Sequence, residues 1–415
     1  MIDANPKAQA VSSTRPAPFS QAFAHELLAE YGSPLYVYDA DALRATIRRI
    51  GNSVPYPHAR FHFASVTNGN VSLLRIFRES GWGLHANTPG DAHLGLQAGF
   101  APAQMVYSGS NLNRDEMAQM LAWGVGTLNL DSLSQLELLR EVYRGNDAAT
   151  APRIGFRINL PEVTGESRIG VRPAEFPEAA RMAGDAGLKI SGIHFYRGTG
   201  TNSTAAFTRS IAAVLEAGRS LPDWEYLDFG GGFGYPYRDD RAGFDWEEFG
   251  AELARQVMAL DRPLELLIEP GRAAIAGCGT LLARVVSVKW QDKKQIVGVD
   301  TSVANIAVLS VHGGYREIRA LRDDAGGQYV TDVCGNTTFS RDYLGRGCML
   351  PALQADDMIA ILDVGAYGYA MSSHFLHRPR PAEVLVEDGA HRLIRRRESY
   401  EALTAHQVPA SEAGA

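Results

Sequence analysis

Three stretches of this chain combine glycines with residues that can hold and polarise an anionic ligand. A hydrophobic run at Leu227–Phe229 ends in the triplet Gly230-Gly231-Gly232, whose N–H groups can approach a phosphate closely. Glu269-Pro-Gly-Arg272 closes the next apolar run, and Asp363–Gly368, which contains Tyr367, follows later. Amides, a guanidinium, a phenol and a carboxylate together predict a phosphate site with an acid beside it.

Each of these features also has a simpler interpretation. A glycine triplet often makes only a tight turn before a helix, and a helix is expected here over 244–260. A carboxylate at a strand end, such as Glu269, is often solvated or paired with an arginine. Because the features occur together, we favour phosphate binding, with Glu269 contacting the same ligand. The expected helix would also place the glycine loop near a helix N-terminus, where anions bind well.

The composition limits the classes of protein to which the chain can belong. Its 415 residues are 45% hydrophobic and 21% charged, which suits a globular protein of two to three domain-sized units. The net charge of -7 gives no basic footprint for nucleic acid. We expect no membrane span and no secretory signal, because no apolar run has the required length or flanks. Three cysteines are too few for a disulfide framework and fit a reducing cytoplasm.

The order of apolar runs predicts a barrel. Residues 1–18 are expected to be disordered, followed by a helix at 19–32, a strand at 35–39 and a helix at 40–50. Eight apolar runs then read as strands at 60–65, 82–86, 105–108, 127–130, 153–159, 189–196, 225–229 and 264–269. Helices are expected between them, for example at 71–80, 89–99, 114–123 and 132–143, with N-caps supplied by Asp131-Ser132 and Asn202-Ser203. This alternation indicates a parallel sheet, and eight strands can close a (β/α)₈ barrel; a doubly wound open sheet is the alternative.

After residue 269 the helical periodicity fades and an all-β domain is predicted. Strands are expected at 280–288, 295–299, 328–333, 358–362 and 382–386. The expected boundaries are a barrel domain at 19–274, a β domain at 275–401 and a loose tail at 402–415. If the barrel forms, its chemistry belongs at the C-terminal strand ends. The residues there are 64–66, His85, Ser108, Asn159, 194–196, 230–232 and 269–272.

These motifs resemble a known family, the fold-type III PLP-dependent decarboxylases that act on diaminopimelate, ornithine or arginine. The resemblance covers roughly residues 34–386. It rests on five ordered motifs, which are Leu35–Asp39, Leu227–Gly234, Glu269–Arg272, Asp363–Gly368 and Met371–Ser373 with Arg378–Glu383. It implies an alanine-racemase-like TIM barrel whose β domain takes in the N-terminal strand, and a homodimer acting on a small amino-acid-like or carboxylated substrate.

The resemblance also implies a binding site for pyridoxal 5'-phosphate. In the family the glycine loop, an arginine like Arg272 and a tyrosine like Tyr367 hold the phosphate, and a glutamate like Glu269 bonds the protonated pyridine nitrogen. The expected cofactor-binding residues are His194, Gly230, Gly231, Gly232, Glu269, Gly271, Arg272 and Tyr367.

The catalytic positions depart from the family pattern. The family's Schiff-base lysine lies in a Tyr-Ala-x-Lys-Ala-Asn stretch, which aligns here with Phe63–Asn68 and puts Val66 at the lysine position. Valine offers no amine to the cofactor, and the chain has only 5 lysines against 35 arginines. Tyr196 aligns with the histidine that stacks on the cofactor, and His85 aligns with an aspartate. Thr338 and the phenylalanine after it align with a cysteine-acid pair that the partner subunit usually contributes.

These departures define the candidate catalytic residues. His85 and Tyr196 would have to move protons in place of the missing lysine. Arg197 would favour an anionic substrate, and Thr338 would face the partner's barrel. We expect no metal site: three histidines at 62, 85 and 194 could converge, but the histidine at 62 should point away from the barrel centre.

Two functions follow as hypotheses. The first is a divergent amino-acid lyase that binds PLP without a covalent link. The second is an inactive decarboxylase homologue that acts as a dimerising or regulatory partner. A third, an ordinary decarboxylase with only its lysine replaced, is disfavoured by the other changes at Tyr196, Thr338 and Phe339.

Overall fold

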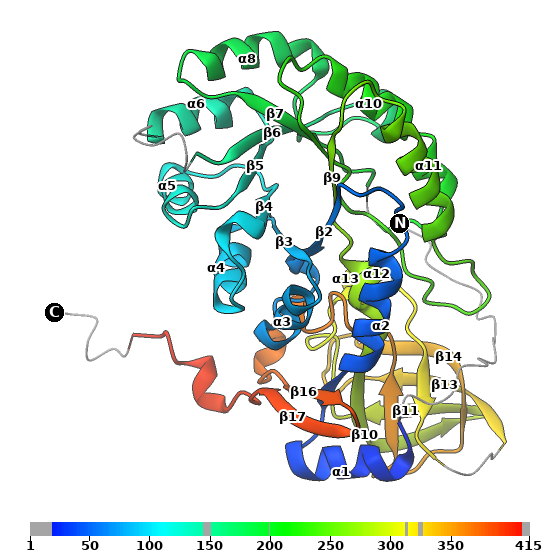
Figure 1. Cartoon of the computed structure of the whole chain (residues 1–415). Helices are drawn as coiled ribbons and strands as arrows, with labels where there is room; N and C mark the ends of the chain where they lie inside the picture. The colour runs from blue at the N-terminus through cyan, green and yellow to red at the C-terminus, as the bar shows by residue number, and fades with distance from the viewer. Residues whose placement is uncertain (1–18, 144–150, 199, 312–313, 323–326, 409–415) are drawn as a thin grey trace. The chain divides into compact units, whose positions relative to one another are not determined.

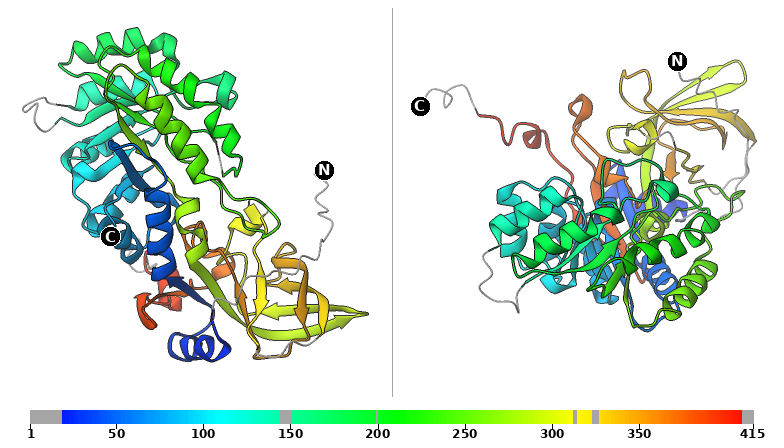
Figure 2. Two further views of the ribbon diagram at one scale, coloured as in Figure 1. Left: turned by 45° about the vertical axis from the view of Figure 1, so that its right-hand side comes forward. Right: turned by 90° about the horizontal axis from the view of Figure 1, so that it is seen from above.

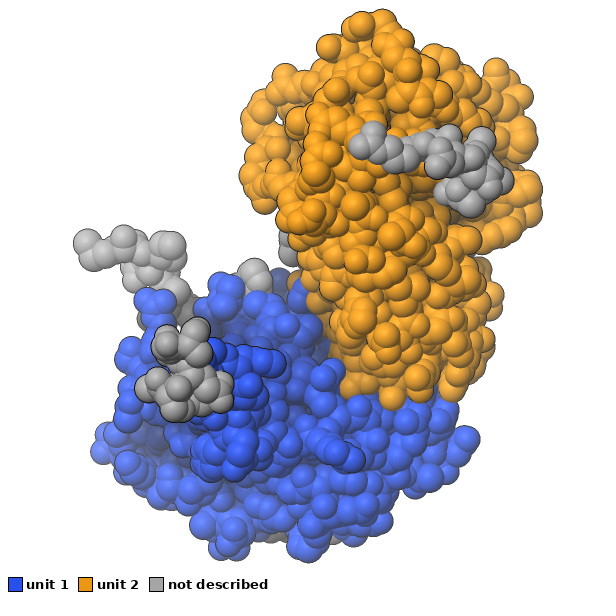
Figure 3. Space-filling model, turned by 90° about the vertical axis from the view of Figure 1, so that its left-hand side faces the viewer, with its two compact units in different colours: residues 1–42, 237–241, 276–415 blue, residues 43–236, 242–275 orange. Residues whose placement is uncertain are grey.

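The computed structural model describes residues 19–143, 151–198, 200–311, 314–322 and 327–408 of the chain. The segment 1–18 expected to be disordered, and residues 409–415 of the expected tail, lie outside the described residues. The chain divides into two compact units, which Figure 3 shows in different colours. One contains residues 43–236 and 242–275, and the other contains residues 1–42, 237–241 and 276–415.

The first unit is a closed barrel of eight parallel strands that pair in chain order. The strands are β2 (Ala59–Ala64), β3 (Gly83–Ala86), β4 (Met105–Tyr107), β5 (Thr127–Leu130), β6 (Arg153–Arg157), β7 (Ile190–His194), β8 (Tyr226–Asp228) and β9 (Glu265–Ile268). Pairing of β9 with β2 closes the ring. The prediction of a (β/α)₈ barrel is confirmed, and the open-sheet alternative is wrong.

Helices surround these strands, as the two sets of views show (Figures 1 and 2). They are α3 (Val71–Glu79), α4 (Pro89–Gln97), α5 (Arg114–Ala122), α6 (Leu133–Val142), α7 (Pro161–Thr164), α8 (Phe176–Gly184), α9 (Thr204–Thr208), α10 (Ile211–Arg219), α11 (Trp246–Met258) and α12 (Arg272–Ile275). The expected N-cap at Ser132 is confirmed, because its hydroxyl accepts from the Gln135 amide. Ser203 precedes α9 but makes no side-chain capping bond.

Alternation along β2 decides which side chains enter the barrel. The Phe63 ring stacks on Phe77 of α3, with ring centroids 3.7 Å apart, so Phe63 faces the helices. His62 must then face the interior, because successive strand residues point to opposite faces. The expectation that His62 points away from the barrel centre is therefore wrong. His62 pairs with Gly83, and His85 lies two residues further along β3, so His62 is nearer the N-terminal end of the barrel.

The second unit is built on a nine-stranded sheet within the part of the chain that the structure describes. Its strands are β1 (Leu35–Asp39), β10 (Gly279–Gln291), β11 (Lys294–Val299), β12 (Ile318–Ala320), β13 (Gln328–Cys334), β14 (Tyr343–Pro351), β15 (Met358–Ile361), β16 (Ala382–Glu387) and β17 (Ala390–Arg395). The N-terminal strand β1 lies between β10 and β16. The predicted β domain is thus confirmed as a fold class, although β12, β14 and β17 were not predicted.

Helix α1 (Gln21–Tyr31) packs on this sheet through Ala24, Leu27 and Leu28, which join Leu35 and Val384 in one buried apolar cluster. Burial of such a cluster is the main stabilising contribution to this unit. The remaining described α-helices are α2 (Ala40–Gly51) and α13 (Val308–Val311). None of the described helices is long and apolar enough to cross a membrane.

Candidate active site

Three strand ends meet at the C-terminal face of the barrel. The Phe195 amide donates to the Asp228 carbonyl (2.7 Å), and the Phe229 amide donates to the Leu267 carbonyl (2.8 Å). The Glu269 amide in turn donates to the Gly230 carbonyl (2.8 Å). The segments that follow β7, β8 and β9 therefore continue the strand pairing beyond the barrel, where enzymes of this architecture carry their catalytic residues.

Close backbone packing explains the glycine triplet. Gly230 has φ 67°, and a Cβ there would lie 1.9 Å from the Phe195 carbonyl oxygen. Gly232 has φ 97°, and a Cβ there would lie 2.3 Å from the Gly198 carbonyl oxygen. The Gly230 amide donates to Asp228 Oδ1 at 3.0 Å. Among the described residues, no backbone carbonyl accepts from the amides of Gly231 and Gly232.

The segment Glu269–Arg272 packs beside this loop. A Cβ at Gly271 would lie 2.7 Å from Thr67 Cγ2, which holds the segment against the end of β2. A Cβ at Gly200 would lie 3.1 Å from Arg272 Nε, so this guanidinium borders the loop after β7. Helix α11 starts only at Trp246 and is capped by Asp245. An anion here would be held by loop amides and Arg272, while the contribution expected of the α11 N-terminus stays a prediction.

Glu269 lies at the centre of a buried polar cluster. Its side chain is 2% exposed, and its Oε2 lies 3.3 Å from His194 Nε2 and 3.5 Å from His85 Nε2. Its Oε1 is buried and has no hydrogen-bond partner among the described residues. Asp228 and His194 present donor atoms that all lie within 4.8 Å of one another and of Glu269. The structure thus brings His85 and His194 together with Glu269, three residues singled out from the sequence.

Asp228 was not predicted as a site residue, although it immediately precedes the glycine motif. Its Oδ2 accepts from Asn129 Nδ2 (3.1 Å), which also donates to Ser108 Oγ (2.9 Å). The Asn129 Oδ1 accepts from the Tyr226 hydroxyl at 2.8 Å. These bonds fix the Asp228 carboxylate below the loop. The sequence did contain one signal for Asp228, because it is an acidic residue at the end of a buried barrel strand.

Burial changes the protonation of the two carboxyl groups. It raises the pKa of Glu269 to about 7, against the opposing effects of the Asp228 hydrogen bond and the Arg157 charge. Burial, and then the charge of Glu269, raise the pKa of Asp228 well above its ordinary value. Burial therefore favours the protonated form of both carboxyl groups over the charged form.

The two imidazoles are neutral at the same pH. Burial lowers the pKa of His194 to about 4, with Asp228 raising it and Arg157 lowering it further. Burial, and then the neighbouring His194 and His62, lower the pKa of His85 well below its ordinary value. Both ring nitrogens of His85 are buried without a hydrogen-bond partner among the described residues. A neutral imidazole carries one N–H and one lone pair, so His85 can donate to and accept from a ligand.

His62, nearer the other end of the barrel interior, should make stability depend on pH. Burial, with the charges of Arg153 and Arg60, lowers the pKa of His62 to about 3. The unfolded chain takes up this proton below about pH 6.5, so folding stability falls as the pH drops through 6.5. Between pH 7 and pH 5 we expect the wild type to lose about 2 kcal/mol more than His62→Gln. Urea unfolding at both pH values measures this, and parallel pH profiles would contradict it.

One guanidinium near the segment after β7 was not suggested by the sequence. Arg157, at the end of β6, lies over the Tyr196 ring, with its Cζ 5.0 Å from the ring centroid. Arg197 instead donates through Nε to the Ala206 carbonyl of α9 at 3.3 Å. Arg157 is therefore the cation that the structure places beside Tyr196, where it can attract an anionic group.

Val66 lies at the same face of the barrel, in the short 3₁₀ turn Ser65–Thr67 after β2. Its side chain is 42% exposed, and the neighbouring Ser65 hydroxyl donates to the His85 carbonyl at 3.0 Å. Lys189 is the single lysine in the sequence of this unit. It precedes β7 at the opposite end of the barrel and pairs with Glu225. The C-terminal face therefore carries no lysine.

Two predicted site residues, Tyr367 and Thr338, belong to the other unit. Tyr367 has φ 58° and lies in the loop after β15, as does Asp363 with φ 56°. A bulky residue in the left-handed region is costly, and such strain concentrates at functional positions. Thr338 is exposed in the turn between β13 and β14.

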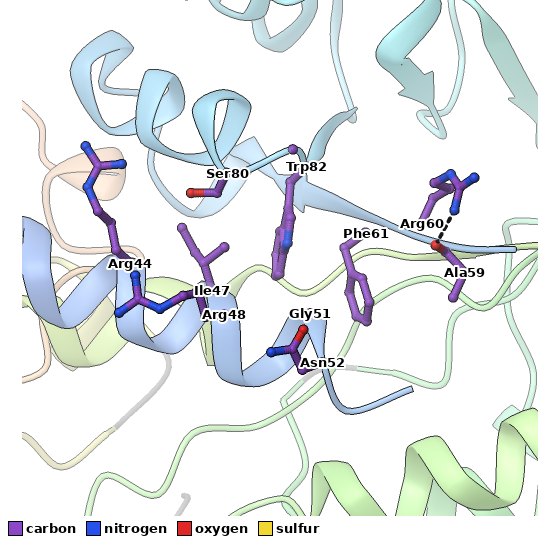
Figure 4. Close-up of a pocket in the computed structure, with 11 residues that line it drawn as sticks. Arg44, Ile47, Arg48, Gly51, Asn52, Ala59, Arg60, Phe61, Ser80 and Trp82 are labelled. Carbon is purple, nitrogen blue, oxygen red and sulfur yellow. Dashed lines mark hydrogen bonds between the residues drawn. The ribbon is translucent and has the colours of Figure 1, made fainter. Parts of the chain in front are cut away.

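The barrel also has a hollow of about 630 Å³, but it lies at the other end (Figure 4). Residues from α2, from the start of β2 and from the turn before β3 line it, with Phe61 stacked beside Trp82 at 5.2 Å. These are N-terminal strand ends, so the hollow is separate from the cluster around Glu269.

Comparisons with known proteins agree with this geometry. The model of the pyridoxal-binding domain of pyridoxal-dependent decarboxylases matches residues 40–276. The diaminopimelate decarboxylase of Methanothermobacter thermautotrophicus is 34% identical over 410 residues, covering 93% of this chain and 94% of that protein. That of Zymomonas mobilis is 31% identical over 398 residues, covering 91% and 93%.

A solved structure has the same fold throughout. The crystal structure of diaminopimelate decarboxylase from Helicobacter pylori, complexed with L-lysine, matches with a TM-score of 0.84 and 26% identity. The match covers 92% of this chain and 98% of that chain. From the matching domain and these relatives, the chain belongs to the family of pyridoxal-dependent decarboxylases.

Proposed function

We propose that the barrel binds pyridoxal phosphate without a covalent link and acts as a lyase on a small amino acid. One observation supports this most strongly: a buried Glu269 whose Oε1 has no hydrogen-bond partner among the described residues lies beside a glycine loop, and the barrel unit has no lysine of its own at this face. The relatives are named diaminopimelate decarboxylases, so we infer a substrate with an amino group and more than one carboxylate.

The residues present fit both ends of this cofactor. The amides of Gly231 and Gly232 and the guanidinium of Arg272 suit a phosphate, since N–H groups and arginine bind phosphate oxygens well. The unpartnered Glu269 Oε1 suits the pyridine nitrogen. Only a residue for covalent attachment of the cofactor is missing, because Val66 carries no amine.

The chain's own residues would then have separate roles in the reaction. Bound pyridoxal phosphate supplies an electron sink for negative charge at the substrate's α-carbon. Glu269 keeps that sink effective by holding the ring nitrogen. His85, neutral and unpartnered at both ring nitrogens, would offer one N–H and one lone pair to the substrate. Arg157, beside Tyr196, attracts a substrate carboxylate.

The test is a titration with pyridoxal phosphate followed by borohydride reduction and intact mass measurement. We expect a saturable absorbance change, loss of the cofactor on dialysis and no mass increase of the reduced protein. Pyridoxal without its phosphate is the matched control and should bind at least about tenfold more weakly, because it loses the contacts to Arg272 and the loop. A stable adduct would show that another amine reaches the cofactor. No binding at all would refute the proposal.

A second function is favoured by the set of altered positions. Val66, Tyr196 and Thr338 all differ from the family pattern at once, as expected for an inactive homologue that serves as a partner subunit. We infer a homodimer in either case, which light scattering of the purified protein would show or exclude. Mixing with an active diaminopimelate decarboxylase separates the two functions, because a partner subunit should form hetero-oligomers and show no turnover of its own.

A further inference from the structure

Two arginine–tyrosine contacts join the same two short segments of the unit that holds the β sheet. The Arg316 guanidinium lies over the Tyr237 ring, with its Cζ 3.7 Å from the ring centroid. The Arg238 guanidinium lies over the Tyr315 ring, with its Cζ 4.0 Å from the centroid. Each arginine thus covers the tyrosine that precedes the other arginine in the sequence. We call this pair of contacts the arginine–tyrosine clasp.

The clasp is more than a contact between surface side chains, because one of its arginines is buried. Arg316 is 4% exposed, and its Nη1 donates to the Tyr315 carbonyl at 2.8 Å. Tyr237, Arg238 and Tyr315 are partly buried. Attraction between a cation and an aromatic ring is stronger when the cation has lost its water, so the Tyr237 ring compensates Arg316 for part of its lost hydration.

On one side, the clasp holds the loop that follows the glycine triplet. Tyr237 comes five residues after Gly232, between β8 and α11. Residues 237–241 belong to the unit with the β sheet, although the residues before and after them belong to the barrel unit. The chain therefore leaves the barrel unit for a short stretch soon after the glycine loop, and the clasp attaches that stretch.

On the other side, the clasp is connected to the strand that leads to Tyr367. Arg316 is followed by Glu317, whose carbonyl accepts from the Leu362 amide at 2.9 Å. Strand β12 then pairs with β15, after which the loop with Tyr367 begins. Both loops that the resemblance connects with a phosphate are therefore attached to the short segment 315–318.

We propose that Arg316 is a positioning residue for these two loops. It would act through the Tyr237 ring and through the backbone of segment 315–318, without touching the ligand. A loop that is already held in its binding conformation binds more tightly, because less ordering has to accompany binding. The inference rests on the proposed function and deepens it, since the loops are held for a phosphate group.

The first experiment compares two ligands in the full-length protein. Arg316→Gln should bind pyridoxal phosphate at least about tenfold more weakly than the wild type does, whereas its affinity for pyridoxal without phosphate should be unchanged. Arg316→Lys keeps a positive charge near the ring and should recover most of the loss. Arg346→Gln is the matched control, because it removes an exposed arginine that lies 3.6 Å over Tyr343 in the same unit. It should bind both ligands as the wild type does.

The second experiment follows the loop without any ligand. Trypsin cuts after arginines in segments that open, and Arg241 is exposed at the end of the attached stretch. We expect Arg316→Gln to be cut after Arg241 at least about tenfold faster than the wild type, as measured by fragment masses, and Arg346→Gln to be cut at the wild-type rate. Tyr237→Leu changes only the partly buried partner, so it guards against a folding failure of Arg316→Gln, and it should give the same two results.

The outcomes separate this inference from the proposed function. If the wild type binds neither ligand, the proposed function fails and the positioning role fails with it. If the wild type binds pyridoxal phosphate but Arg316→Gln and Tyr237→Leu bind it equally well, or are cut at the wild-type rate, only the positioning role is wrong. A loss of affinity that is equal for both ligands would likewise show that Arg316 merely stabilises the fold.

Discussion

Replacing Val66 with lysine is expected to convert loose cofactor binding into covalent attachment. Val66 is 42% exposed at the C-terminal face of the barrel, so a lysine there would not have to bury its ammonium. The turn that carries it is tied to β3 through the Ser65 bond to His85, close to the Glu269 cluster. We expect borohydride to fix about one pyridoxyl group per chain in Val66→Lys and none in the wild type.

Val66→Met is the control for this gain, because methionine has a similar reach and no amine. It should bind the cofactor reversibly and show no adduct by intact mass. We do not expect Val66→Lys alone to give a fast decarboxylase, since His85 and Tyr196 also depart from the family pattern. If Val66→Lys binds pyridoxal phosphate yet yields no adduct, position 66 does not face the cofactor, and the alignment with the family's lysine is wrong.

The barrel could be predicted from the sequence because its strands are buried on both faces. Such strands are continuous apolar runs, and the run at 127–130 was placed with its observed ends. Strand β17 was missed because none of its side chains is buried and its polar and apolar residues do not alternate. Strand β14 was missed because Gly345 and Gly347 interrupt its apolar residues. In the structure both glycines nevertheless belong to this strand of the sheet.

The site was predicted only where a local rule applied. The glycine triplet could be recognised in the sequence because its backbone must pack against Phe195 and Gly198. Glu269 could be recognised because it ends a strand. Asp228 and Arg157 were not identified, because their roles come from contacts with residues far away in the chain. Asn129, for example, meets Asp228 only because closure of the barrel brings β5 and β8 into one interior.

Gly230→Ala should cause the largest loss, both of stability and of cofactor binding. An alanine at φ 67° costs about 1–2 kcal/mol from the left-handed backbone alone. Its Cβ would also lie 1.9 Å from the Phe195 carbonyl oxygen, so the segments after β7 and β8 would have to separate. With overpacking of this kind adding about 1–3 kcal/mol, we expect a total loss of about 3 kcal/mol or more. The separation would also pull the amides of Gly231 and Gly232 away from the phosphate.

Gly187→Ala isolates the contribution of the close contact. Gly187 has nearly the same backbone, φ 69°, in the turn between α8 and β7, but a Cβ there would meet nothing within 4 Å. It should therefore lose only the 1–2 kcal/mol of left-handed strain and keep full affinity for pyridoxal phosphate. Urea unfolding and cofactor titration of the two variants side by side measure both effects. Equal losses in the two would mean that the glycine loop does not pack against Phe195, and that the phosphate site proposed on that packing is misplaced.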